Sequence, residues 1–480
     1  MYKRLFSETL IYGVGAVLPR VLSFVLVGVI TKATGAAEYS IYSQLYAIAS
    51  FLNVILQFGF ETSYFRYSVD KQQEQRVFNT AFIFLAVNSI IFLAAVYVFL
   101  PQIASYLKYQ KFPQYIIWFS WFILLDTLCV VPFARLRFQG RPRVFTLIKL
   151  INSFIYFGLI VFFLFAYTSP PTEFLGFSIN QKIGFVFIAN LFASLATVFL
   201  LIPFMKGLSF RINPSLLKTM LNYSYPIMLA GIAYTLNENF DKMIQRGVIS
   251  EVEAGAYGAC YKLAALMTIV VMAFRMGVEP FFFKQMNNKN AKQTYATVME
   301  LFTIVASFIV VALLSNILWI KDIFLHRPEY LLAMKIVPII VIANLFFGIY
   351  NTLSVWYKVS DKTLIGSSIS WIGAILTLLI NIFLLPLIGF MASAWATIAA
   401  YGSMMIISYF LGRKYYKIPY KVRKIVFYIS LSILLGLISY YIFKGNIILG
   451  NIVVLLYLAI VYYLEKNVLL KSLLNENKNR

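Results

Sequence analysis

The sequence predicts an all-α polytopic membrane protein with about fourteen transmembrane helices. Of its 480 residues, 61% are hydrophobic and only 12% are charged, whereas soluble proteins carry about 25% charged residues. Apolar runs long enough to cross the roughly 30 Å hydrocarbon layer recur along nearly the whole chain. The alternating segments of about ten residues that a transmembrane β-barrel requires do not occur. The composition is therefore that of a helical bundle embedded in a bilayer.

The predicted spans follow one another with short connections, so no soluble domain is inserted between them. The first span begins near residue 10 and has no clear small-residue cleavage site, so we expect a retained helix rather than a signal peptide. In chain order, the predicted spans cover about residues 10–31, 39–60, 77–100, 114–134, 144–167, 183–204, 220–245, 254–280, 294–319, 332–357, 363–385, 389–412, 425–443 and 447–464.

One fragment occurs twice, as GFETSYFR at residues 59–66 and as GVEPFFFK at residues 277–284. Further landmarks keep nearly the same offset along the chain: Tyr42 and Tyr46 against Tyr257 and Tyr261, and Arg143 against Lys362. A near-constant offset indicates that one ancestral half was used twice. Each half holds an even number of predicted spans, so both enter the bilayer in the same sense. We therefore expect two six-helix lobes related by a pseudo-twofold axis along the membrane normal.

The repeat divides the chain into three predicted parts. Residues 1–210 form an N-terminal six-helix lobe, and residues 211–412 form a C-terminal six-helix lobe. Residues 413–480 hold a basic linker, two extra transmembrane helices and a cytoplasmic tail. The two extra helices lie outside the repeat and carry almost no charge, so we expect them to face lipid or a partner.

The net charge of +23 follows membrane topology and does not indicate a nucleic-acid-binding surface. Most of the 41 Lys and Arg residues fall in segments on the same side of the bilayer as the N-terminus. The positive-inside rule then predicts a multi-pass protein of the cytoplasmic (inner) membrane with both termini in the cytoplasm. The richest basic clusters, residues 135–143 and 413–424, are expected to face anionic headgroups. We expect no nucleic acid as a partner.

Residues suited to metal or enzymatic chemistry are sparse. Cys129 and Cys260 fall in separate spans without metal-ligand spacing, and the single histidine, His326, lies in an outward loop. No Walker loop, hydrolase elbow or HExxH motif occurs. We therefore expect no metal, no cofactor and no ATP hydrolysis by this chain. Any transport must use an ion gradient, the membrane potential or consumption of the product.

A polar stripe in span seven requires an explanation, because ionisable groups at bilayer depth cost about 2.5–3.5 kcal/mol each on insertion scales. The stripe is flanked by Asn237 and Asn239 and has helical spacing: Thr235, Glu238, Asp241, Lys242 and Gln245. It must face protein or water. Two interpretations stay open: a wet cavity whose carboxylates bind a coupling cation, or a neutralised pair in which Glu238 bridges Lys242.

Span eight carries three charges. Arg275 and Glu279 are one turn apart and can form a salt bridge. Lys262 lies on a different face of an ideal helix, so we expect its partner among the carboxylates of span seven. Pro280 is expected to end this helix at the inner surface.

Further ionisable residues fall inside other predicted spans. Arg20, beside Pro19 in span one, has no carboxylate within a turn. It either bridges to another helix or binds an anionic ligand, because its planar fork suits phosphate. Asp126 lies in span four. Lys149 and Lys335 lie within about two turns of span ends and are expected to reach the interface.

Several motifs in order resemble a known family. They are YGVG at 12–15, GAAEYSIY at 35–42, AGAYGACYKL at 254–263, AFR at 273–275 and EPFFF at 279–283. Together with Asn237, Asp241 and Lys242, they resemble the bacterial polysaccharide-export flippases. That O-antigen-type oligosaccharide flippase family belongs to the multidrug/oligosaccharidyl-lipid/polysaccharide exporter superfamily. The resemblance covers about residues 5–420 and is most specific in span eight.

The resemblance implies a transporter rather than an enzyme. Its substrate would be a polyprenyl-pyrophosphate-linked oligosaccharide (an O-antigen, capsule or exopolysaccharide repeat unit), moved from the inner to the outer leaflet by alternating access. Lys262 and Arg275, with Arg20 assigned from its chemistry alone, would attract the pyrophosphate. The cavity charge or ion coupling would fall to the remaining polar residues of spans seven and eight: Glu238, Asp241, Lys242, Glu279 and Asn237.

Partners and alternatives follow from the same resemblance. The expected partners are the lipid-linked oligosaccharide, membrane lipids, and a glycan polymerase or glycosyltransferases of the same polysaccharide or lipopolysaccharide pathway; the duplicated bundle predicts a monomer. Two other transporters stay open: a lipid II flippase for peptidoglycan, and a cation-coupled multidrug antiporter, which usually has about twelve spans. From a different class, a membrane glycan polymerase or ligase usually needs a large outward loop, and the longest outward loops here have about 16 residues.

Overall fold

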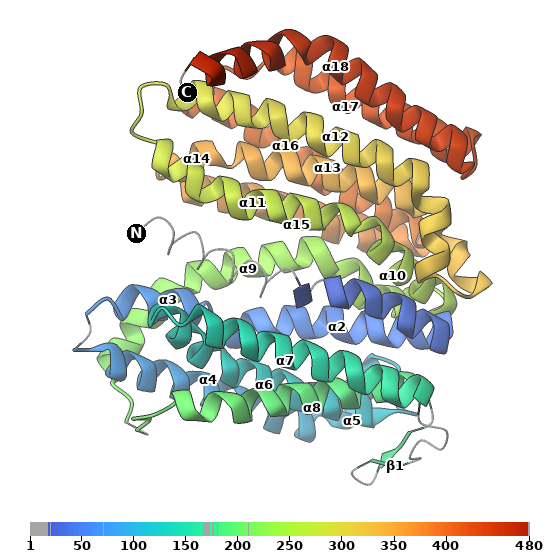
Figure 1. Ribbon diagram of the computed structural model, residues 1–480. Helices are drawn as coiled ribbons and strands as arrows, with labels where there is room; N and C mark the ends of the chain where they lie inside the picture. The colour runs from blue at the N-terminus through green and yellow to red at the C-terminus, as the bar shows by residue number, and fades with distance from the viewer. Residues whose placement is uncertain are drawn as a thin grey trace. The chain divides into compact units, whose positions relative to one another are not determined.

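The computed structural model describes residues 18–19, 21–70, 72–166, 173–174, 177–179, 181–209 and 211–478. Within these ranges the regular secondary structure is helical except for a short antiparallel hairpin, in which β1 (Glu173–Phe174) pairs with β2 (Phe177–Ser178). The contacts among the helices define two compact units (Figure 1). The first holds Met1–Ala259, Arg327–Leu332 and Asn381–Phe390, and the second holds Cys260–His326, Ala333–Ile380 and Met391–Arg480.

The first unit is organised around α6. A short apolar helix, Val21–Ala33, comes first. The following helices are α2 (Ala36–Gln57), α3 (Phe60–Tyr67), α4 (Glu74–Val98), α5 (Leu100–Tyr106), α6 (Pro113–Phe138), α7 (Pro142–Val161) with the π turn η1 (Phe162–Ala166), α8 (Ile183–Leu201) with the 3₁₀ turn η2 (Ile202–Phe204), α9 (Pro214–Val248) and α10 (Glu251–Ala264), whose last residues belong to the second unit. Helix α6 packs against α2, α4 and α8, and 72% of its most apolar stretch is buried.

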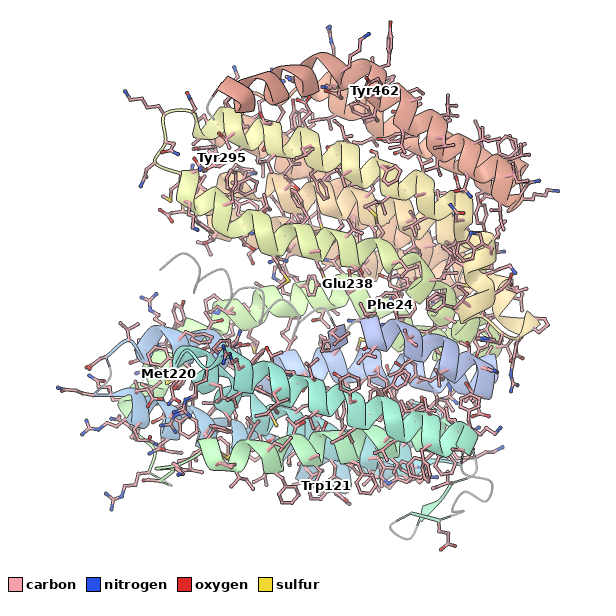
Figure 2. The ribbon with its side chains drawn as sticks, viewed as in Figure 1. Phe24, Trp121, Met220, Glu238, Tyr295 and Tyr462 are labelled. Carbon is pink, nitrogen blue, oxygen red and sulfur yellow. The ribbon has the colours of Figure 1, made fainter. Side chains whose placement is uncertain are left out.

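The second unit is organised around α13. Its helices are α11 (Leu266–Gln285), α12 (Ala291–Phe324), the 3₁₀ helix η3 (Pro328–Ile336), α13 (Val337–Leu353), α14 (Val355–Val359), α15 (Thr363–Ile388), α16 (Met391–Tyr415), α17 (Val422–Leu437) with the π turn η4 (Ile438–Ile442), and α18 (Ile447–Lys478). The beginning of η3, up to Leu332, and the end of α15, from Asn381, belong to the first unit. Helix α13 packs against α11, α12 and α16. Peripheral apolar side chains stay exposed in both units, as with Trp121 on α6 and Tyr462 on α18, which are 40% and 67% exposed (Figure 2). Such outward apolar surface suits a lipid environment.

Local sequence explains several helix ends and contradicts one expectation. Proline stands in the first turn of α6, α7, α9 and α13, where it removes no intrahelical hydrogen bond. Asn213 caps α9, because its side chain accepts a hydrogen bond from the Leu216 amide. The expectation that Pro280 ends its helix is wrong, since α11 continues to Gln285. A proline in a membrane helix removes one backbone hydrogen bond, and the neighbouring structure can tolerate that loss.

The predicted all-α polytopic fold is confirmed. In the described part of the chain, twelve helices are long and apolar enough to cross a membrane, and they match twelve of the predicted spans. Span seven is present as α9, a helix of 35 residues, but its polar stripe makes it too polar for that criterion. Span one lies partly outside the described residues. The boundaries predicted at residues 210 and 412 describe an internal repeat, which the two contact-defined units do not test.

Candidate functional site

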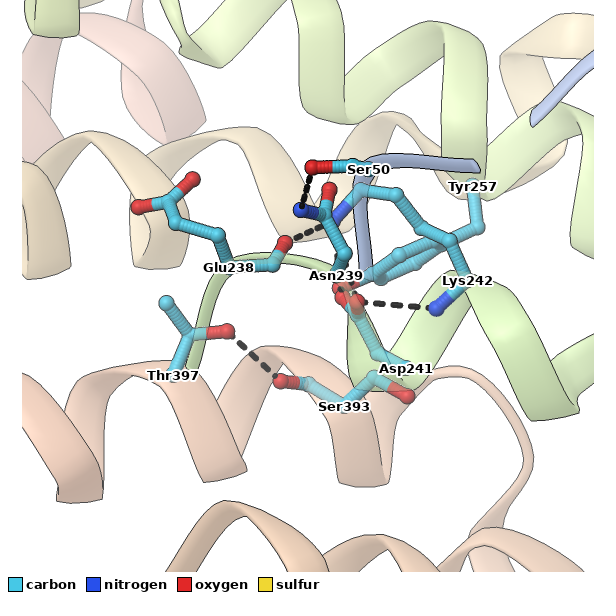
Figure 3. A network of polar contacts seen from close by, with 8 residues as sticks. All are labelled: Ser50, Glu238, Asn239, Asp241, Lys242, Tyr257, Ser393 and Thr397. Atoms are coloured by element: carbon cyan, nitrogen blue, oxygen red, sulfur yellow. Dashed lines mark hydrogen bonds and ion pairs between the residues drawn. The ribbon is translucent and has the colours of Figure 1, made fainter. Parts of the chain in front are cut away.

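Helix α9 buries a charged network inside the first unit. Asp241 and Lys242 are only 3% and 7% exposed. The Lys242 ammonium donates to Asp241 Oδ1 at 3.0 Å and to the backbone carbonyl of Glu238 at 2.7 Å. The hydroxyl of Tyr257 on α10 also donates to Asp241 (Figure 3). The charge of this carboxylate is therefore balanced within the unit.

The residues of the predicted polar stripe differ in their burial and in their partners. Thr235, Asp241, Lys242 and Gln245 are buried, as is the flanking Asn237, so the stripe faces protein rather than lipid. Glu238 is half-buried. The neutralised pair is formed between Lys242 and its chain neighbour Asp241, whereas the sequence interpretation placed Glu238 in that role. Helical spacing predicts pairs between residues four positions apart on an exposed helix surface. Here the pairing is set by another helix, because the hydroxyl of Tyr257 holds the carboxylate of Asp241 beside Lys242.

The polar contacts that link α9 to α2 and to its other neighbours were not expected from the sequence. Gln44 on α2 donates to the Met243 carbonyl at 2.9 Å and accepts from the Tyr109 hydroxyl at 2.9 Å. Burial raises the pKa of Tyr109, so this phenol stays protonated and able to donate. Arg246 continues the same line: it lies over the Tyr109 ring at 4.4 Å and pairs with Glu251 at 2.6 Å. These residues fasten one end of α9 to its surroundings.

The most family-like motif, residues 254–263, has a structural role in its first half. A Cβ atom on Gly255 would lie 1.7 Å from the backbone oxygen of Ala36, and one on Gly258 would lie 2.6 Å from Ser43 Oγ. The beginning of α10 therefore touches the backbone of α2, and only glycine permits that approach. Small residues at such contacts are typical of membrane helices.

The charged cluster of the second unit has a surplus of positive charge. Glu279 on α11 accepts from Arg275 Nε at 3.4 Å and from the ammonium of Lys358 on α14 at 2.5 Å. The predicted i,i+4 salt bridge between Arg275 and Glu279 is therefore present. Two cations share one carboxylate, and the Arg275 side chain is 48% exposed. The cluster lines a pocket of about 10 Å³ together with Asn351 and other residues of α13 and α14. Lys358 follows Glu279 by 79 positions, so no local spacing could have indicated it.

The structure describes the remaining predicted cations less fully. Lys262 lies on α10 with an exposed side chain. Arg20 lies outside the described residues, so its assignment stays a prediction. Among the residues that the structure describes, no group of three or more His, Cys, Asp and Glu side chains is placed to hold a metal ion.

A large polar cavity of about 530 Å³ lies inside the first unit. Asp126 on α6 accepts from the Ser194 hydroxyl at 2.9 Å, and the ammonium of Lys149 on α7 lies 4.3 Å from the Phe133 ring centre. Lys149, expected to reach the interface, thus lines this cavity. Hydrogen bonds join Tyr46 to Tyr156 at 2.9 Å and Asn190 to Tyr46 at 2.6 Å along its wall. The sequence showed these polar residues singly, but their grouping depends on the packing of α2, α6, α7 and α8.

These features define a class of protein. Two compact units of apolar, span-length helices with buried polar groups describe a multi-pass membrane protein. The family model described as "Polysaccharide biosynthesis protein" matches residues 34–274, half of the chain, and the chain belongs to that family. A second family model, MatE, matches residues 226–383. The protein is therefore a membrane flippase or exporter of the multidrug/oligosaccharidyl-lipid/polysaccharide exporter superfamily. No curated protein matches the chain.

Solved structures share the fold. The lipid II flippase MurJ in an inward closed conformation is 15% identical, with a TM-score of 0.73 over 95% of this chain and 99% of that chain. A multidrug resistance MATE family transporter of the MOP superfamily, inward-facing, is 11% identical, with a TM-score of 0.66 over 85% and 97%. The Vibrio cholerae MATE transporter VcmN in its bent form is 14% identical, with a TM-score of 0.55 over 91% and 98%. At these identities the likeness concerns the fold alone.

Proposed function

We propose that this protein is a flippase for a polyprenyl-pyrophosphate-linked oligosaccharide, which it moves from the inner to the outer leaflet of the cytoplasmic membrane by alternating access. Membership of a polysaccharide biosynthesis family supports a glycan substrate. The observation that carries the proposal is the cluster of Arg275, Lys358 and Glu279, in which two cations share one carboxylate.

The chemistry of this cluster suits a pyrophosphate. Arginine presents a planar fork that matches phosphate oxygens, and lysine adds a compact positive charge. With Glu279 between them, the two cations keep a surplus charge of one, which a phosphate oxygen can share. The Arg275 side chain is 48% exposed and so accessible to a ligand. A cationic drug would meet net repulsion here, which disfavours the multidrug antiporter.

The position of the cluster along the chain also agrees with the direction of transport. Glu279 lies near the end of α11, ahead of a connection that carries Lys289 and is followed by Lys292 in the first turn of α12. The positive-inside rule assigns this connection to the cytoplasm, with both chain termini. A substrate made on the cytoplasmic leaflet would therefore meet these cations first. Lys262 and Arg20 are proposed to continue the pyrophosphate path.

The deciding experiment is flipping of a fluorescent polyprenyl-pyrophosphate tetrasaccharide in proteoliposomes. Arg275→Gln and Lys358→Gln should each slow flipping at least about tenfold, because each removes one of the two charge-assisted contacts to phosphate. The matched control is Arg137→Gln, which removes a cation that pairs with Glu61 in the first unit. Unchanged flipping in the Arg275 and Lys358 double variant would overturn the assignment.

The same vesicles distinguish the alternative substrates. A lipid II probe carries the same pyrophosphate on a different sugar, so preferential flipping of that probe would favour the peptidoglycan precursor. Efflux of a cationic dye by wild-type protein that flips neither lipid would favour the multidrug antiporter.

A further inference from the structure

An apolar groove and a basic pocket adjoin on the second unit, at the connection between α16 and α17. The groove has a volume of about 160 Å³ and is lined by α13, α16 and α17 through Ile349, Leu353, Met405 and Ile429 among others. The pocket, of about 270 Å³, is lined by Arg413, Lys417 and the following residues. Tyr409 and Tyr420 line both spaces, so the two adjoin.

The charges of this connection fall into two groups. Lys421 pairs with Glu300 at 3.0 Å, and Lys424 pairs with Glu465 at 2.6 Å and also with Glu300. Arg413 and Lys417 have no ion pair or hydrogen bond to any residue that the structure describes. Glu300 and Glu465 are therefore paired with the lysines at the start of α17, and the two cations of the pocket stay available to an external anion.

Tyr420 supplies an independent observation. This residue lines both the groove and the pocket, and its hydroxyl oxygen is buried and has no hydrogen-bond partner among the described residues. Burial raises the pKa of Tyr420, so the phenol stays protonated and can donate. A buried polar group without a partner is unfavourable, and an oxygen-rich ligand at this junction would relieve that cost.

We propose that the groove and the pocket form one site for an anionic glycerophospholipid. Its phosphate binds Arg413 and Lys417, an ester or phosphate oxygen accepts from Tyr420, and one acyl chain lies in the apolar groove. Along α16, the distance from Arg413 to Met405 is about 12 Å, which matches the upper part of an acyl chain. The positive-inside rule assigns this connection to the cytoplasmic side, where anionic lipids attract basic residues. The site is independent of the transported substrate.

Selectivity must come from the headgroup, because an acyl chain gains little by leaving one apolar environment for another. The experiment is native mass spectrometry of the full-length protein in non-ionic detergent. It is titrated with dioleoylphosphatidylglycerol and, separately, with dioleoylphosphatidylcholine, which has the same chains and no net charge. Wild-type protein should bind one phosphatidylglycerol at least about tenfold more tightly than phosphatidylcholine.

Variants locate the site. Arg413→Gln with Lys417→Gln should remove the tenfold preference, whereas the matched control Lys414→Gln with Arg423→Gln, which removes equal charge from residues outside the pocket, should keep it. Tyr420→Phe removes only the hydroxyl and should weaken phosphatidylglycerol severalfold. Ile429→Trp fills the groove and should weaken both lipids.

Three outcomes would overturn the proposal. The first is equal binding of the two lipids by wild-type protein. The second is wild-type affinity for phosphatidylglycerol in the Tyr420→Phe variant, together with an Arg413→Gln, Lys417→Gln double variant that keeps the same lipid preference as its Lys414→Gln, Arg423→Gln control. The third is tighter binding of a polyprenyl phosphate probe than of phosphatidylglycerol at the same residues, which would assign the site to a carrier lipid instead.

Discussion

The glutamate of each copy of the repeated fragment forms an ion pair with a distant cation, but in different surroundings. In the first copy, residues 59–66, Glu61 pairs with Arg137 of α6, 76 positions later. In the second copy, residues 277–284, Glu279 pairs with Lys358 of α14, 79 positions later. The first pair borders a polar cavity of about 530 Å³, and the second borders a pocket of about 10 Å³, which holds about one water.

The difference indicates where the halves have specialised. If the chain contains the internal repeat that the sequence predicts, an ion pair that recurs at nearly the same spacing is expected to belong to the repeated unit. Among the described residues, the ionisable groups that line the first cavity balance, with Glu61 and Asp126 against Arg137 and Lys149. The second pocket adds Arg275 without a further carboxylate and so keeps a surplus positive charge. Among the residues that the structure describes, the surplus of positive charge therefore lies beside the second copy.

The largest expected effect compares Gly255, which precedes the second copy of the fragment, with Ser40, which precedes the first copy at nearly the same offset. Gly255→Ala places a Cβ atom 1.7 Å from the Ala36 oxygen, so the backbones of α10 and α2 must separate, at a cost of about 3 kcal/mol or more. Ser40, 215 positions earlier, hydrogen-bonds only within its own helix, and Ser40→Ala should cost below about 1 kcal/mol. Thermal unfolding in detergent measures both. Equal melting temperatures for the two variants would contradict the close approach.

The next effect compares the first residues of the two copies. Gly59 has a φ of 71° and a Cβ there would lie 3.1 Å from the Ser224 oxygen, whereas Gly277 lies within α11 with nothing within 4 Å. Gly59→Ala should therefore destabilise by about 2 kcal/mol, and Gly277→Ala should be neutral or stabilise by up to about 1 kcal/mol. If Gly59→Ala instead raised the free energy of unfolding in the same assay, the left-handed turn between α2 and α3 would not require glycine.

A third comparison tests the charge surplus. Glu279→Gln removes the only carboxylate between Arg275 and Lys358, so binding of a short-chain prenyl pyrophosphate should tighten by about fivefold. Glu61→Gln should leave that affinity unchanged, because its ion pair lies in the other copy. Calorimetric titration of the purified protein gives both values. Weaker binding after Glu279→Gln would show that the carboxylate orients the cations rather than competes for them.

The smallest expected effect concerns the cavity of the first unit. Asp126 accepts a hydrogen bond from Ser194 and has no ion pair to a described residue. An amide oxygen can accept the same bond, so Asp126→Asn should change the free energy of unfolding by less than about 1 kcal/mol. Asp241→Asn, which breaks the buried contact to Lys242, is the matched comparison and should cost about 3 kcal/mol or more. A large loss from Asp126→Asn alone would reveal an unrecognised partner.

The sequence predicted those features of the fold and site that depend on local spacing. Thirteen predicted spans correspond to helices, α9 included, and the Arg275–Glu279 bridge has the expected i,i+4 geometry. The polar stripe of span seven was correctly expected to avoid lipid. The sequence did not predict which residues of the stripe pair with each other. Lys242 pairs with its neighbour Asp241, and Tyr257, which also contacts Asp241, comes from another helix.

By itself, the sequence determined the class of protein, because hydropathy and helical period are properties of a single segment and survive any arrangement of the segments. The tertiary structure alone decided which distant side chains meet. Lys358 reaches Glu279, Gly255 meets Ala36, and Asp126 and Lys149 line one cavity. The rotation and crossing of each helix select these contacts, and one-dimensional periodicity leaves both undetermined.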